Sequence, residues 1–179
     1  MRKILLLLCL ALSLFALQND KDMLSGELEN GLKYYIKENK LPQKTAIFYL
    51  VVNSGSTDER EGEQGLAHFL EHMAFNGSRD FSKNELIKQL ESLGVKFGAD
   101  LNAQTSYDQT SYTLSINVNE KNLKDVFKVF SNWIDGVKVD AGELDKERGV
   151  IMEEERQRNT PAYRLYLAQS KDIFAGSIY

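Results

Sequence analysis

The alternation of apolar and polar positions divides most of the chain into short strands and amphipathic helices. Residues 26–39 (GELENGLKYYIKEN) carry a central Asn-Gly pair, the strongest short-range signal for a hairpin of two strands. Residues 44–56 (KTAIFYLVVNSGS) are rich in β-branched and aromatic side chains, which predicts a central strand. Residues 95–119 alternate over a longer stretch and predict two more strands, the first ending near residue 105 and the second covering about 110–118.

Helical periodicity appears in the other segments, with apolar residues recurring every three or four positions. Ser82 and Glu85 form a capping box at the start of one helix, and Gly94 ends it. Asp140 and Glu143 are expected to cap another helix in the same way. The predicted helices cover residues 65–75, 82–94, 122–136 and 140–158, and a further piece that begins at Pro161.

This order of elements, with no visible repeat or linker, indicates an α+β fold in which helices pack on one face of a mostly antiparallel sheet. With 179 residues and 42% hydrophobic content, the chain can bury one sizeable core. The formal net charge is −4, and no basic patch follows any predicted element. We therefore expect no nucleic-acid partner.

The first residues form a separate segment, MRKILLLLCLALSLFAL, with a basic start and a short apolar core. This pattern predicts a secretory signal peptide over residues 1–17, and an uncleaved membrane anchor is the alternative. The single cysteine, Cys9, lies inside it, so residues 18–179 contain none. We expect an exported, periplasmic protein of a Gram-negative bacterium, with no stable membrane insertion after cleavage.

Both histidines of the chain lie in GLAHFLEHMAFNG, residues 65–77. On a helix, His68, Glu71 and His72 share one face. Two imidazoles at this spacing can bind one zinc ion, and a carboxylate beside them can accept a proton from a metal-bound water. The alternative is an ordinary packed helix, but packing does not explain why the only two histidines of the chain are placed here.

A catalytic zinc site needs a third protein ligand and an open position for water. Because no histidine or cysteine remains in the mature chain, this ligand has to be a carboxylate, and ELDKERGVIMEEERQRN (143–159) is the obvious source. On a helix, Glu153 is turned about 100° from Glu154, so the two glutamates point in different directions. We expect the apolar pair of one helical stripe to face the core and to turn two glutamates inward. That stripe consists of Glu147, Val150, Ile151 and Glu154.

The segments GLAHFLEHMAFNGS and ERGVIMEEER together resemble the inverzincin peptidases, which include pitrilysin, insulysin and the mitochondrial processing peptidase. The sequence is most similar to the exported insulinase-like zinc proteases of bacteria. The resemblance runs from about Leu28 to Tyr179 and includes FGADLNAQTSYDQTSY, where the family carries an NAxT-type strand. It implies a domain repeated in tandem around a chamber. Residues 18–179 would then be an N-terminal peptidase domain that is incomplete, with its C-terminal part absent.

The resemblance implies one Zn²⁺ per chain. His68, His72 and Glu154 match the zinc ligands, and Glu147 matches a supporting acidic residue near the metal. The distance in sequence from His72 to Glu154 is longer than in the better-known members, so Glu153 remains the alternative third ligand.

The function implied is a zinc-dependent endopeptidase that hydrolyses peptides or unfolded polypeptides, with Glu71 as the general base. Substrate is expected to add as a strand along Asn102, Ala103 and Gln104, for which the alternative is an ordinary core strand. A missing C-terminal half or a second subunit is expected to complete the site. Two other readings are a non-catalytic peptide-binding or assembly subunit of the same fold, and a structural zinc module closed by Glu147 as a fourth ligand.

Overall fold

The structure is a computed structural model that describes residues 20–179. The chain divides into two compact units, one ending at Gln43 and the other formed by Lys44–Tyr179. The predicted signal peptide, residues 1–17, lies outside the described residues. Within the described part, every helix is too short or too polar to cross a membrane.

The first unit contains the predicted hairpin. Strands β1 (Met23–Glu27) and β2 (Lys33–Lys37) pair antiparallel. Gly31 adopts a φ of 85°, which favours glycine, and its N–H donates to the carbonyl of Leu28 at 2.9 Å. The Asn-Gly pair therefore does form the connection between the two strands.

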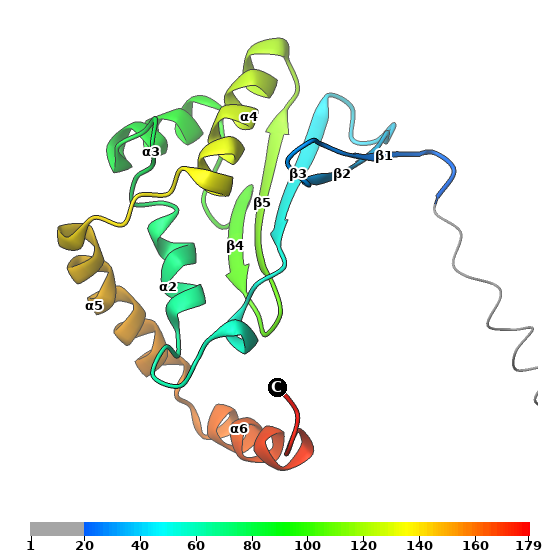
Figure 1. Cartoon of the computed structure of the whole chain (residues 1–179). Helices are drawn as coiled ribbons and strands as arrows, with labels where there is room; N and C mark the ends of the chain where they lie inside the picture. The colour runs from blue at the N-terminus through cyan, green and yellow to red at the C-terminus, as the bar shows by residue number, and fades with distance from the viewer. Residues whose placement is uncertain (1–19) are drawn as a thin grey trace, which may run out of the picture. The chain divides into compact units, whose positions relative to one another are not determined.

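The second unit is built on a three-stranded antiparallel sheet with the order β3-β5-β4, which can be followed in Figure 1. These strands are Thr45–Val52, Thr110–Asn117 and Leu101–Thr105, respectively. The prediction that residues 44–56 form a central strand was wrong for this sheet, because β5 lies between β3 and β4. On the face of the sheet opposite the core, β3 exposes Ile47 and Tyr49.

Helices cover one face of this sheet, as predicted. Helix α2 lies between the sheet and α5 in Figure 1, and it contacts both β4 and α5. A short 3-10 helix, η1 (Ser56–Asp58), follows β3. The longer helices are α2 (Leu66–Met73), α3 (Lys83–Ser92), α4 (Glu120–Asp135), α5 (Ala141–Arg158) and α6 (Pro161–Ile173).

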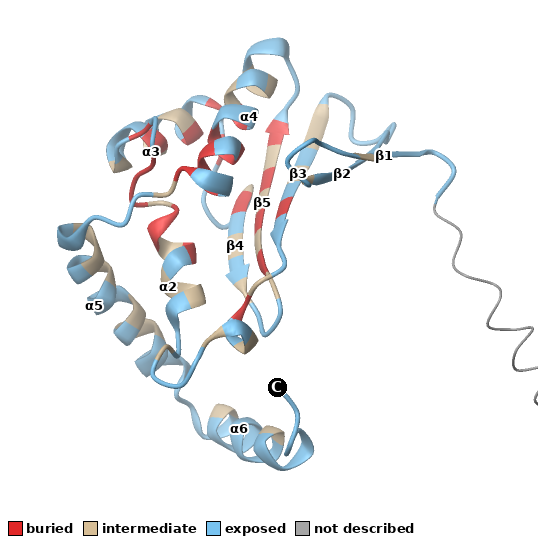
Figure 2. Cartoon of the chain, viewed as in Figure 1, coloured by how far each residue is buried: buried red, intermediate tan, exposed pale blue. Residues whose placement is uncertain are grey.

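The core lies between the inner face of the sheet and helices α3 and α4, where buried residues concentrate in Figure 2. Trp133 of α4 is central to it: its ring stacks on Tyr112 of β5 with 5.2 Å between centroids. The Trp133 indole N–H donates to the carbonyl of Ala74, just after α2, at 3.1 Å. This contact attaches the end of α2 to the core.

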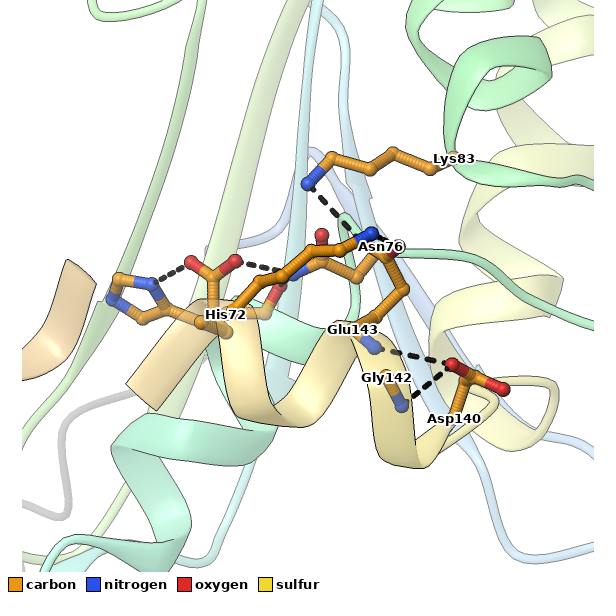
Figure 3. Close-up of polar contacts among 8 residues, drawn as sticks. His72, Asn76, Lys83, Asp140, Gly142 and Glu143 are labelled. Atoms are coloured by element: carbon orange, nitrogen blue, oxygen red, sulfur yellow. Dashed lines mark hydrogen bonds and ion pairs between the residues drawn. The ribbon is translucent and has the colours of Figure 1, made fainter. Parts of the chain in front are cut away.

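Helix caps follow the sequence signals with one exception. Ser82 and Glu85 form the predicted reciprocal capping box. Asp140 caps α5 by accepting from the N–H groups of Gly142 and Glu143, as Figure 3 shows. The side chain of Glu143 does not complete a capping box, because it pairs with Lys146 and Lys83.

The prediction that Val150 and Ile151 of α5 face the core was wrong. Val150 is 47% exposed, and α5 has no buried residue. The reason is the layer order: α2 separates α5 from the sheet (Figure 1). Polar pairs such as His72–Glu147 and Lys83–Glu143 join α5 to the rest of the unit.

Candidate metal centre

Helix α2 is fixed at its start by a carboxylate from the preceding loop. Glu59 accepts hydrogen bonds from the N–H groups of Gly65 and Ala67, both at 2.8 Å. These are unpaired donors of the first turn, where a negative charge also stabilises the helix dipole. With the start held by Glu59 and the end attached to the core, α2 presents His68, Glu71 and His72 from a fixed backbone.

The ligating atoms of His68, His72 and Glu154 converge within 4.8 Å of one another. The Nε2 atoms of His68 and His72 are 3.1 Å apart. Oε2 of Glu154 lies 3.6 Å from Nε2 of His68 and 3.4 Å from Nε2 of His72. Ligands at zinc bond lengths stand about 3.3–3.5 Å apart in a tetrahedral site. The donor set therefore fits a zinc ion in chemistry and spacing.

The ring of His72 is oriented by Glu147. Its Nδ1 lies 2.8 Å from Oε1 of Glu147, and Oε2 of Glu147 accepts from the amide of Asn76 at 2.8 Å. The side chains of His72 and Asn76 are labelled in Figure 3. A carboxylate can only accept, so Nδ1 carries the N–H and donates a hydrogen bond to Glu147. The lone pair of the neutral imidazole is then on Nε2, the nitrogen that faces His68 and Glu154.

This geometry argues against a closed four-ligand site. Glu147 lies on the Nδ1 side of His72 and is absent from the converging donors, which are His68, His72 and Glu154. A tetrahedral ion held by these three residues would keep its fourth position for water among the described residues, as catalysis requires.

The two candidate third ligands differ in their partners. Glu153 forms two short hydrogen bonds with Arg156, at 2.7 and 2.6 Å, and a third with Gln157. Glu154 instead points at the two imidazoles. The structure therefore brings Glu154, and not Glu153, to the histidines.

Glu71 is 7% exposed and lies on the same helix as the two histidines of the candidate ligand group. Its Oε2 accepts a hydrogen bond from the hydroxyl of Thr105 at 2.7 Å. Thr105 is the last residue of β4, so a strand of the sheet contacts the candidate base directly.

A cavity of about 370 Å³ adjoins these residues. Its polar wall includes Glu71, His72, Asn76, Glu147 and Glu154, and its apolar wall includes Phe75, Ile87, Phe97 and Leu101. Of the predicted substrate-binding residues, Asn102 and Ala103 line the cavity and Gln104 does not. Gln104 is exposed on β4.

The electrostatics favour a neutral imidazole at His68. Burial, and secondly the neighbouring His72, hold the pKa of His68 below its ordinary value. A neutral imidazole is the form that binds a metal ion.

Asn76 and Thr105 contact the site but were not predicted from the sequence. Asn76 follows His72 by four positions, so helical periodicity extended by one turn would have placed it on the same face. Thr105 is the final residue of the NAQT segment, whose other residues were considered only for substrate binding.

An HxxEH helix whose imidazoles converge with a distal glutamate, next to a buried glutamate and a sheet edge, defines a zinc metallopeptidase domain of the inverzincin type. Residues 34–170 match the family described as Insulinase (Peptidase family M16), and the chain belongs to this family.

Two relatives named "Probable zinc protease PqqL" are each 39% identical to this chain. The protein from Haemophilus influenzae aligns over 161 residues, 89% of this chain and 17% of its own length. The protein from Escherichia coli aligns over 163 residues, 90% of this chain and 18% of its own length. The chain thus spans less than a fifth of the length of these relatives.

Solved structures agree. The crystal structure of the periplasmic protease PqqL from Escherichia coli matches with a TM-score of 0.86 and 38% identity, over 91% of this chain and 18% of that one. Pitrilysin matches with a TM-score of 0.69 at 23% identity, which shows a shared fold.

Proposed function

We propose that the protein carrying this chain is a zinc-dependent endopeptidase that hydrolyses peptides or unfolded polypeptides. The observation that carries this proposal is the convergence of His68, His72 and Glu154 beside the buried carboxylate of Glu71 and the adjoining cavity. Membership of a peptidase family with relatives named zinc proteases supports it.

In this proposal His68, His72 and Glu154 hold one zinc ion per chain. Bound zinc supplies a Lewis acid that polarises the scissile carbonyl and lowers the pKa of water to about 7. Glu71 accepts the proton from the attacking water and later delivers it to the leaving amine. Glu147 keeps His72 in the tautomer whose Nε2 can bind the metal.

The substrate would bind as an added strand at β4. In the described sheet β4 has β5 on one side only, so its other edge can pair with an extended peptide. Main-chain hydrogen bonds along Asn102, Ala103 and Gln104 would tolerate many sequences. The cavity beside Asn102 and Ala103 would then receive a substrate side chain.

Two further features of the protein belong to the proposal. The match to a chain about five times as long supports a further C-terminal part, or a second subunit, that completes the site. The name of the Escherichia coli relative, a periplasmic protease, together with the basic and apolar residues 1–17, supports export to the periplasm.

Zinc content, measured by elemental analysis of the purified protein, is the first test. One zinc per chain is expected, with a large loss in Glu154→Gln and none in the adjacent Glu153→Gln. Cleavage of casein, an unfolded protein, is the second test: Glu71→Gln should keep the zinc and lose turnover. Normal cleavage by Glu71→Gln would refute the role of the base, and zinc binding without cleavage by the wild-type protein would favour the non-catalytic subunit.

A further inference from the structure

We propose that Thr105 is a positioning residue for Glu71, and that its hydroxyl, together with Thr110, determines which oxygen of the Glu71 carboxylate accepts the proton. This inference rests on the proposed function, in which Glu71 is the general base. It adds a group on the sheet to a site that the sequence motif places on helices alone.

The geometry is a short chain of hydroxyl groups that ends on the carboxylate. Thr105 Oγ1 lies 2.7 Å from Oε2 of Glu71 and 3.3 Å from Oγ1 of Thr110. Thr110 Oγ1 lies 3.0 Å from the carbonyl oxygen of Ser54. Thr105 and Thr110 are a cross-strand pair of β4 and β5, so both hydroxyls are on the face of the sheet that α2 covers.

A count of protons fixes the direction of these bonds. The ionised carboxylate of Glu71 and the carbonyl of Ser54 can only accept, and the two threonines supply one proton each. Both acceptors are satisfied only when Thr105 donates to Glu71 and Thr110 donates to Ser54. Thr105 therefore has no alternative acceptor that leaves the network complete, and its O–H stays directed at Oε2 of Glu71.

The backbone holds this donor in place. Gly55 packs so closely on the β4–β5 turn that an added Cβ would lie 2.4 Å from the carbonyl oxygen of Ser106. The N–H of Ser56 donates to the same carbonyl at 3.1 Å, and the N–H of Ser106 donates to the carbonyl of Gln109 at 2.8 Å. The end of β4 is therefore fixed on two sides, and the Thr105 hydroxyl moves little relative to the sheet.

The consequence concerns the orientation of the base. The carboxylate of a glutamate is carried on three rotatable bonds and can present either oxygen, and a general base acts only from hydrogen-bond distance of the proton it takes. With Oε2 bonded to Thr105, Oε1 is the oxygen left for the attacking water. The hydroxyl thus restricts Glu71 to the orientation that is ready to react.

The test compares Thr105→Val, which keeps the branched shape and removes the hydroxyl, with Thr105→Ser, which keeps the hydroxyl. In the zinc-loaded intact protein, Thr105→Val should lower kcat for casein cleavage by about 10- to 100-fold, with little change in KM or zinc affinity. Thr105→Ser should recover most of kcat. Thr113→Val, on the opposite face of the same sheet, is the matched control. If Thr105→Val folds poorly, Thr105→Ala replaces it.

A second measurement does not depend on turnover. The ¹³C chemical shift of the Glu71 carboxyl carbon in the metal-free protein should move in Thr105→Val and return in Thr105→Ser. An unmoved shift, a kcat at the wild-type level in Thr105→Val, or equal losses in the valine and serine variants would each overturn the inference. Because Glu71→Gln is measured in parallel, an inactive glutamine variant beside a fully active valine variant would reject this inference and leave the proposed function standing.

Discussion

Nδ1 of His72 and Oε1 of Glu147 lie 2.8 Å apart although 75 positions separate the residues in sequence. This bond joins α2 to α5 and decides which imidazole nitrogen can face a metal ion. Glu147→Ala should therefore weaken zinc binding by about 10- to 100-fold, the usual effect of losing a partner of a metal-bound histidine. Competition with a chromogenic chelator measures it. Glu155→Ala, an exposed glutamate of the same helix, is the control, and equal affinities in the two variants would contradict the assignment.

Asn76 supports Glu147 in turn, because its amide donates to Oε2 of Glu147 and to the carbonyl of His72. Asn76→Leu, which keeps the branched shape and removes the amide, should weaken zinc binding by about tenfold, since Glu147 loses a donor that orients it. Asn76→Asp should weaken zinc binding further, because it places a second acceptor where Glu147 needs a donor.

The cost of Asn76→Leu to folding should be about 1–2 kcal/mol, because the carbonyl of His72 and Oε2 of Glu147 each lose a donor. The Oδ1 atom of Asn76 is buried without a hydrogen-bond partner among the described residues, so leucine also removes an unsatisfied acceptor. Thermal melting of the metal-free variants measures this cost. A melting temperature far below the wild-type value in Asn76→Leu would show that the amide acts on the fold and not on the metal centre.

Gly55 should tolerate no side chain. Its φ of −154° is open to any residue, so the restriction comes from the backbone of the β4–β5 turn, which a Cβ would approach to 2.4 Å. Gly55→Ala should lower the free energy of unfolding by about 1–3 kcal/mol. Gly149→Ala is the control with the opposite expected effect. Gly149 lies in a helix and an added Cβ would meet nothing within 4 Å, so the free energy of unfolding should rise by about 0.5–1 kcal/mol. Urea denaturation of the metal-free protein compares the two.

The capping box of α3 predicts a pH dependence. The backbone and side-chain hydrogen bonds from Ser82 hold the pKa of Glu85 below its ordinary value. A lowered folded-state pKa means that Glu85 stabilises the protein above its unfolded-state pKa and that this contribution is lost as pH falls through the folded-state pKa. Glu85→Gln should therefore melt below the wild-type temperature at pH 7, and the difference should shrink towards pH 3. A constant difference across this range would show that the charge is not involved.

The parts of the site that the sequence predicted are those set by local geometry. His68, Glu71 and His72 share a face because a helix repeats every 3.6 residues, and this requires no knowledge of the rest of the chain. The hairpin turn, the Ser82 cap and the Asp140 cap are local in the same sense.

Features that depend on contacts between distant parts of the sequence were harder to predict. Glu154 does lie beside the histidines, but the reason given for it fails, since Val150 of the same stripe is exposed. The phase of α5 is set by polar contacts with α2, for which apolar periodicity is no guide. The contact between Thr105 and Glu71 spans 34 positions and depends on how β4 packs against α2, so residue pattern alone could not place it.

The absence of buried residues on α5 has a thermodynamic consequence for metal binding. Two of the three converging donors come from α2 and the third from α5, so an ion at this site joins two helices, one of which buries no side chain fully. Ion affinity and helix docking are then two measures of one coupled equilibrium. Any partner surface that presses α5 against α2 raises the affinity for the ion, and the ion in return strengthens the hold of that partner by the same free energy.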